Sequence, residues 1–237
     1  MKTTFAIVAI ATAFLFSSPL FAQENVATTP HEFEKEYQPL ETYKDFRIAI
    51  GGGYAFRLGD TEDTGDSKLN EINKKLRHGF TIDADAQYFF RGNWGLGLNA
   101  NYCSSNTSGD DVNIPGIDQR VNYKETQSFL YIGPTYAGRV ESDKFSLITS
   151  VGLGPIFFNS NMNLSGLNIN GSKATLGLNG GIAGEYKMSN NLGVGLKLSY
   201  VMGTIESLEI EGQNFSMDDK ISVSNFMLTT FISFSSR

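Results

Sequence analysis

Apolar and polar residues alternate with a period of two in eight segments from Phe46 onward. Because successive side chains of a strand point to opposite faces, each such segment predicts a strand with one apolar and one polar face. In the first segment the apolar set is Phe46, Ile48, Ile50, Tyr54 and Phe56, and the opposite set is Arg47, Ala49, Gly51, Gly53, Ala55 and Arg57. The pattern predicts an all-β fold.

The remaining segments repeat this alternation at about 80–90, 94–103, 123–140, 145–157, 175–188, 192–202 and 223–234. The segment 123–140 is apolar on both faces: if Arg139 lies on the polar face, then Phe129 and Tyr131 lie there too. Pro134 and Pro155 have no N–H to donate to a neighbouring strand, and they predict bulges or strand ends.

The links between these segments alternate between short and long. The short links are 91–93, 141–143 and 189–191, and the long links are 58–77, 105–122, 159–172 and 206–221. An outer-membrane barrel has short periplasmic turns and longer extracellular loops. Residues 46–237 are therefore expected to form a transmembrane, eight-stranded, antiparallel up-and-down β-barrel with both termini in the periplasm. A soluble β-sandwich would instead show a polar outer face.

The N-terminal part predicts export. Lys2 is followed by an apolar stretch, 5–16, and Ala22 ends a segment suited to signal peptidase, which predicts a signal peptide at residues 1–22. Residues 23–45 are polar and acidic and are expected to form a periplasmic extension. After residue 22 no segment approaches eighteen consecutive apolar residues, so membrane residence must come from strands.

Composition and charge exclude several functions. The net charge of −6 offers no basic excess to neutralise phosphates, which excludes nucleic acid as a partner. Cys103 is the only cysteine, so neither an intramolecular disulfide nor a thiolate metal cluster can form. The acidic segment 60–66 misses the ligand spacing of an EF-hand loop. No metal and no cofactor are expected, although divalent ions bridging this segment to lipopolysaccharide phosphates stay an alternative.

The signal peptide, the eight amphipathic strands, the inward Gly-x-Gly pairs such as Gly95-Leu96-Gly97 and an aromatic-rich last strand together resemble the small outer-membrane β-barrel proteins. That family includes OmpX-like proteins, the OmpA membrane domain and porin-like barrels. The resemblance covers residues 45–237 and implies the outer membrane of a Gram-negative bacterium, insertion by the assembly machinery and contact with lipopolysaccharide. The chain departs from the family by ending Phe234-Ser235-Ser236-Arg237 instead of in an aromatic residue.

Eight charged residues are expected on the inward face: Arg47, Arg57, Asp83, Asp85, Arg139, Glu185, Lys187 and Lys197. Buried charges are costly unless they are paired, and an eight-stranded barrel is just wide enough for side chains to fill. Asp83, Asp85 and Glu185 are therefore expected to pair with Arg47 and Lys197. The predicted network, which also includes Arg139, plugs the lumen; a selectivity filter for a pore is the alternative.

Aromatic residues on the outward face are expected to form girdles at the two membrane interfaces. The candidates are Tyr54, Tyr88, Trp94, Tyr102, Tyr186 and Tyr200.

No catalytic constellation is evident. Hydrolysis of lipid A needs a Ser-His-acid arrangement, but His31 lies in the N-terminal extension and His78 begins the second strand without a His-x-Ser spacing. The leading hypothesis is a non-enzymatic structural or surface-interaction barrel whose four long loops contact a ligand outside the cell. A narrow porin or small hydrophobic-solute channel is an alternative, and a lipid A-modifying enzyme is a third.

Overall fold

The computed structural model describes residues 45–59, 66–90, 93–113, 120–210 and 213–236. The strands are β1 (Phe46–Arg57), β2 (His78–Phe90), β3 (Trp94–Val112), β4 (Val121–Glu141), β5 (Phe145–Leu164), β6 (Leu167–Lys187), β7 (Leu192–Met202), β8 (Thr204–Ile210), β9 (Gln213–Ser222) and β10 (Asn225–Ser236). The one helix in these ranges, α2 (Ser67–Lys75), is too short to cross a membrane. The expected signal peptide, nearly all of the expected extension, His31 and most of the acidic segment 60–66 lie outside the described residues.

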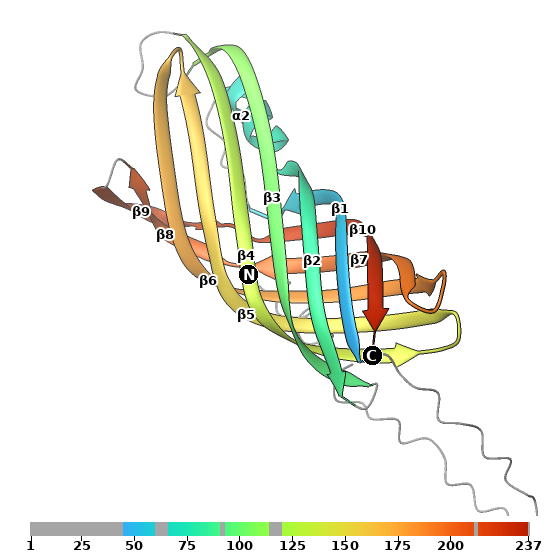
Figure 1. Ribbon diagram of the computed structural model, residues 1–237. Coiled ribbons are helices and arrows are strands. Elements are labelled where there is room, and N and C mark those ends of the chain that lie inside the picture. The colour runs from blue at the N-terminus through green and yellow to red at the C-terminus, as the bar shows by residue number, and fades with distance from the viewer. Residues whose placement is uncertain (1–44, 60–65, 91–92, 114–119, 211–212, 237) are drawn as a thin grey trace, which may run out of the picture. The chain divides into compact units, whose positions relative to one another are not determined.

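Eight strands close into a ring in the order β1, β2, β3, β4, β5, β6, β7 and β10, and every neighbouring pair is antiparallel (Figure 1). This confirms the predicted eight-stranded barrel. β8 continues β7 beyond Gly203, and β9 leads into β10, so the hairpin of β8 and β9 lengthens the seventh and eighth strands of the ring. The start of β1 and the end of β10 lie side by side, because Phe46 pairs with Ser236.

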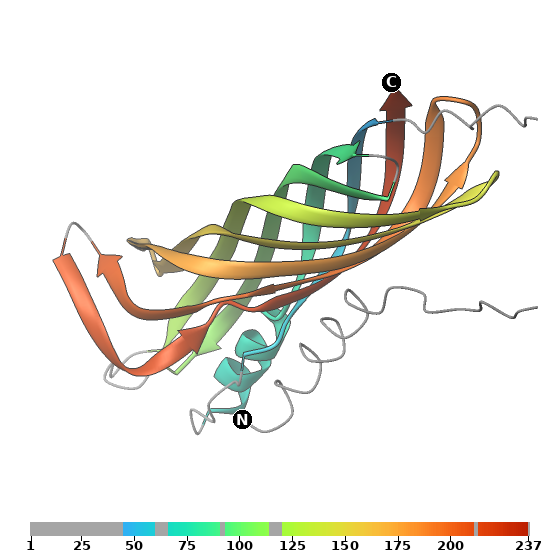
Figure 2. The ribbon, with the colours of Figure 1, turned by 90° about the horizontal axis from the view of Figure 1, so that it is seen from below.

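The register of the ring fixes the tilt of its strands. Successive partners around the ring are Arg47, Gln87, Gly97, Thr135, Gly152, Asn179, Val201, Asn225 and Arg57. One circuit from Arg47 thus returns to β1 at Arg57, ten residues further along. Such a stagger requires strongly tilted strands, which Figure 2 shows as a diagonal winding.

The predicted faces of the strands are confirmed. Along β1, the outward side chains from Phe46 to Phe56 alternate with inward ones, and most outward apolar side chains of the ring are exposed. This run spans roughly 25 Å of membrane thickness at a strand tilt near 40°. In β4, Phe129 and Tyr131 are 1% and 0% exposed, so both face the lumen, as Arg139 does.

Three of the four predicted long loops are mainly strand, and their predicted boundaries are wrong. β3 and β4 continue to Val112 and from Val121, and β5 and β6 are joined only by Ser165 and Gly166. The predicted loop 206–221 holds most of β8 and β9. The period of two persists in the extensions of β3 to β6, but most of their outward residues are serine and asparagine, a composition that is typical of loops.

The predicted loop 58–77 contains α2. The Asp66 side chain caps the helix by accepting hydrogen bonds from the backbone N–H groups of Lys68 and Leu69, at 2.8 and 3.1 Å. Leu69 and the next apolar residue on that helix face, Ile72, pack against Val112 and Tyr123 of the β3–β4 hairpin. Burial of this apolar face holds α2 against the inner side of the sheet.

The prolines do not produce the predicted bulges or strand ends. Pro134 and Pro155 lie inside β4 and β5, and the register of the two strands is the same on both sides of them. The ladder is only interrupted, because the pairs between Tyr131–Ile156 and Thr135–Gly152 are absent from it. The N–H groups that Pro134 and Pro155 lack both fall in this gap, so the two strands keep the same register on either side of it.

Closure of the ring depends on Gly53. A Cβ atom there would lie 2.0 Å from the Leu228 carbonyl oxygen of β10, whereas a Cβ on the outward Gly184 of β6 would meet nothing within 4 Å. We expect Gly53→Ala to lower the free energy of unfolding by about 1–3 kcal/mol through overpacking, with Gly184→Ala near wild type. Urea unfolding in lipid vesicles, with the gel shift of unboiled protein as a fold assay, measures both. Equal stability of the two variants would contradict the close approach of β1 and β10 at Gly53, where the ring closes.

Candidate functional site: the barrel lumen

A lysine and two aspartates form the centre of the lumen. The Lys197 Nζ atom of β7 lies 2.8 Å from Asp83 Oδ1 and 2.7 Å from Asp85 Oδ2 of β2. Asn99 of β3 donates to Asp85 Oδ1 at 2.9 Å, and Asn179 of β6 donates to Asn99 Oδ1 at 3.0 Å. All five side chains are buried. This central cluster ties together strands from opposite sides of the ring.

A second group of charges lies toward the short turns. Arg47 Nε donates to Glu185 Oε2 at 2.8 Å, and its Nη1 atom donates to Gln87 Oε1 at 3.0 Å. Beside it, Arg139 Nε lies 3.2 Å from Glu141 Oε2, and Lys187 Nζ lies 2.5 Å from Glu141 Oε1. The members of this end cluster are Arg47, Gln87, Arg139, Glu141, Glu185 and Lys187.

The two clusters together are electrically balanced. The cations are Arg47, Arg139, Lys187 and Lys197, and the anions are Asp83, Asp85, Glu141 and Glu185. Paired, hydrogen-bonded charges are tolerated in a packed interior where unpaired ones are not.

The structure brings together most of the residues singled out from the sequence, with a sharper division of partners. Lys197 forms ion pairs with both aspartates. Arg47 pairs with Glu185, and Arg139 pairs with Glu141. Sequence reasoning missed Glu141, which it placed in a turn. Its spacing of two from Arg139 is the signal that could have found it, because residues i and i+2 share a face of a strand.

Apolar side chains fill the lumen around and beyond these charges. The Arg47 guanidinium group lies over the ring of Phe231, 5.1 Å from the ring centre. The Arg139 guanidinium group lies over the ring of Phe89 at 4.1 Å. Toward the long hairpins, a layer of buried side chains crosses the barrel. This upper apolar layer comprises Ala55, Cys103, Phe129, Tyr131, Ile156, Phe158, Val201, Ile205, Val223 and Met227.

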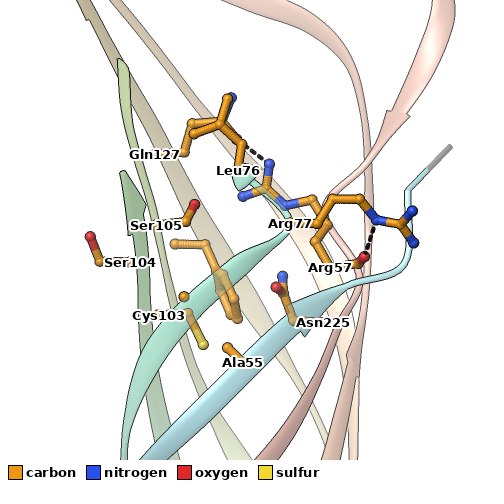
Figure 3. A pocket seen from close by; sticks show the side chains of 11 residues that line it. Ala55, Arg57, Leu76, Arg77, Cys103, Ser104, Ser105, Gln127 and Asn225 are labelled. Atoms are coloured by element: carbon orange, nitrogen blue, oxygen red, sulfur yellow. Dashed lines mark hydrogen bonds between the residues drawn. The ribbon is translucent and has the colours of Figure 1, made fainter. Parts of the chain in front are cut away.

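A small cavity lies between the upper apolar layer and the end of α2 (Figure 3). Its walls include Arg57, Arg77, Cys103 and Phe129, and the Arg77 Nε atom donates across it to the Arg57 carbonyl oxygen at 3.0 Å. The volume is about 10 Å³, which is room for a single water molecule. A hydrated ion does not fit in this space.

Beyond the cavity, a polar group joins β1, β4 and β5. Arg57 donates to Gln127, and Gln127 donates to Glu125 Oε1 at 2.5 Å. Ser160 and Tyr123 also donate to the Glu125 carboxylate. Burial, together with that carboxylate, raises the pKa of the Tyr123 hydroxyl well above its ordinary value. Tyr123 therefore stays protonated and remains a donor.

The aromatic residues expected in girdles all lie on the outer face. Toward the short turns, Trp94 lies 4.8 Å from Phe90 and 6.2 Å from Tyr136 between ring centres, and Tyr186 lies 5.3 Å from Phe145. Tyr88 joins the same end through Phe90. Toward the long hairpins lie Tyr54, Tyr102 and Tyr200. Their arrangement in two groups fits the girdle expectation.

His78 lies on the outer face beside aromatic rings. Its Nδ1 atom shares a hydrogen bond with the Tyr54 hydroxyl, and its ring centre lies 5.2 Å from that of Phe56. Among the described residues, no group of three histidine, cysteine or acidic side chains is arranged to hold a metal ion.

A closed antiparallel ring with an apolar outer wall and a packed, polar lumen defines the class of transmembrane β-barrels. The chain matches the family described as "Outer membrane protein beta-barrel domain" over residues 31–228, and it belongs to that family. This confirms the resemblance seen in the sequence. No curated protein matches the chain.

The chain is similar in structure to solved outer-membrane proteins at low sequence identity. A major outer membrane protein from Thermus thermophilus is 13% identical, with a TM-score of 0.54 over 81% of this chain and 98% of its own. Ail, the attachment invasion locus protein of Yersinia pestis, is 14% identical, with a TM-score of 0.47 over 81% and 99%. The outer membrane protease OmpT from Escherichia coli is 11% identical, with a TM-score of 0.45 over 82% and 97%.

Removing the lysine of the central cluster tests its role. We expect Lys197→Met to destabilise the barrel by about 3–5 kcal/mol, because two buried carboxylates lose their counter-charge. The triple variant Lys197→Met, Asp83→Asn, Asp85→Asn should recover most of that loss, because no buried charge is left unpaired. Urea unfolding in vesicles compares the two with wild type. If the triple variant were less stable than the single one, the pairing would not be what stabilises the lumen.

Proposed function

We propose that the chain is a closed, non-enzymatic outer-membrane barrel that spans the lipid with a plugged lumen and presents its long hairpins at the cell surface. The charge-balanced network of ion pairs in the lumen is the observation that carries this proposal. A pore for hydrated ions needs polar walls around continuous water, whereas here the central cluster lies against the upper apolar layer.

The unequal ends of the barrel support an orientation with both termini in the periplasm. The short turns and both ends of the barrel segment lie together, and β3 to β6 extend far beyond β1 at the other end. In bacterial barrels the short turns are periplasmic. This supports export by a signal peptide at 1–22, a periplasmic extension at 23–45, insertion by the assembly machinery, and extracellular contacts of the hairpins and of α2.

Two other functions have less support. A narrow pore or a solute channel would have to pass the upper apolar layer and the small cavity above it. An enzyme acting on lipid A would need a nucleophile and an acid beside His78, whose side chain instead bonds Tyr54.

Planar-bilayer recording tests the closed lumen. Purified wild-type monomer is expected to give no steady conductance. Phe129→Ala with Phe158→Ala, a cross-strand pair of the upper apolar layer, should give brief openings, because it removes two large aromatic side chains from that layer. The matched control is Phe145→Ala with Phe157→Ala on the outer face, which should stay silent. A stable unit conductance of the wild-type monomer would refute the plugged lumen.

Mass spectrometry of lipid A tests the non-enzymatic role. Cells that express the chain should carry the same lipid A acyl pattern as cells that lack it, and His78→Ala should change nothing, because within the described residues the His78 side chain bonds Tyr54 and not a serine or a carboxylate. A change in acylation that disappears in His78→Ala would establish an enzyme instead.

A further inference from the structure

The outer face of the β3–β6 sheet changes its chemistry at a single row of paired residues. One row around the barrel is Tyr102, Leu130, Phe157 and Ala174. The next row toward the long hairpins is Ser104, Ser128, Asn159 and Ser172. The boundary between lipid-facing and polar wall therefore runs along one line of the register across four strands.

Two more polar rows follow the first. They are Asn106, Thr126, Asn161 and Asn170, and then Ser108, Lys124, Asn163 and Asn168. Of the twelve positions in the three rows, eleven carry an amide or a hydroxyl, and Lys124 carries the one charge. None of the twelve side chains is buried. We name these three rows the amide–hydroxyl face.

Packing of the hairpins does not require this composition. The inward residues of the same strands hold the hairpins together, since Met162 and Leu164 pack with Tyr123 and α2. Asn163 has a local role, because its Oδ1 atom accepts from the Gly166 N–H at 3.1 Å in the turn. Asn161 and Asn170 lie opposite each other, and neither makes a side-chain hydrogen bond within the described part of the chain.

The geometry points to the amide–hydroxyl face as a binding surface for the saccharide part of lipopolysaccharide in the surrounding outer leaflet. This rests on the orientation given under Proposed function. The face continues the lipid-facing wall without a break, so whatever stands above the acyl chains next to the barrel contacts it. In lipopolysaccharide those groups are first the phosphorylated glucosamines of lipid A and then, further from the acyl chains, the sugars of the core oligosaccharide. Amides and hydroxyls both donate and accept hydrogen bonds, as sugar hydroxyls do.

The chemistry of the face argues against other occupants. Protein interfaces depend on aromatic and arginine anchors, and the three rows contain neither. Phosphate groups would select several cations, and Lys124 is the only one in the face. A regularly spaced set of groups that are almost all uncharged hydrogen-bond donors and acceptors matches the hydroxyl groups of the core sugars, with bound water bridging the gaps.

Two pairs of substitutions test this surface. Asn161→Val with Asn170→Val removes two exposed amides. Asn161→Thr with Asn170→Thr is the companion variant, because threonine has nearly the shape and β-propensity of valine but keeps a hydroxyl group. Asn93→Ala with Asn190→Ala, exposed asparagines at the short-turn end, is the matched control. Native mass spectrometry of the folded, detergent-solubilised monomer measures binding of lipopolysaccharide with a complete core, and of lipid A alone.

Wild-type protein, the threonine variant and the control should bind the core-bearing lipid about tenfold more tightly than lipid A. The valine variant should bind both about equally, because the lost amides contact only the core sugars, which lipid A lacks. Free core oligosaccharide should compete with the core-bearing lipid and weaken its binding, and it should leave the binding of lipid A unchanged. The inference is overturned if the valine variant keeps the preference for the core, or if wild type shows none.

A separate measurement tells failure of this inference from failure of the proposed orientation. Asn161→Cys in a Cys103→Ser background should react with a membrane-impermeant maleimide on intact cells. If it reacts but wild type shows no preference for the core, only the saccharide surface is wrong. If it reacts only after the outer membrane is broken, the orientation is wrong, and the saccharide surface is wrong with it.

Discussion

The structure depends on one constraint: no water is present in the lipid to satisfy the backbone, so every strand of the ring must have two neighbours. The pairing of β1 with β10 over the whole length of β1 meets this requirement. Once the ring closes with eight strands and a ten-residue stagger, the width of the lumen is set. Glycines at the seam, such as Gly53, allow the neighbouring backbones to approach.

The narrow lumen in turn decides the chemistry of its filling. Lys197, Asp83 and Asp85 are nearly as buried as the residues of a soluble core, with 4% of each side chain exposed. At that depth a charge needs a partner at contact distance, and the ring supplies one from the opposite wall. The same width explains why the rings of Phe231 and Phe89 lie against the guanidinium groups of Arg47 and Arg139 and cover one face of each.

The sequence alone predicts the ring and its faces well, because the period of two is a local property that each strand carries by itself. Phe129 and Tyr131 show this, since Arg139 was enough to place them inside. Strand ends are harder to predict, because Asn161 and Asn170 read as loop residues although they lie in regular strands. The apolar spacing of Leu69, Ile72 and Leu76 would have indicated α2, which the long-link interpretation passed over.

The exact pairing in the lumen could not be predicted, because it depends on the register across the ring. Which of the cations meets Glu185 follows from the stagger of β1 against β6, two strands that are not neighbours. Glu141 belongs to the end cluster only because β4 runs past its predicted end.

The charge balance of the lumen has an electrical consequence. A voltage across a membrane does work only on charge that can move, at about 2.3 kcal/mol per elementary charge and 100 mV. The central cluster has one excess negative charge and the end cluster has one excess positive charge, so a small displacement of the two clusters together carries no net charge through the field. The interior of this barrel is thus built as a set of fixed dipoles, which a Donnan potential across the outer membrane polarises but does not drive.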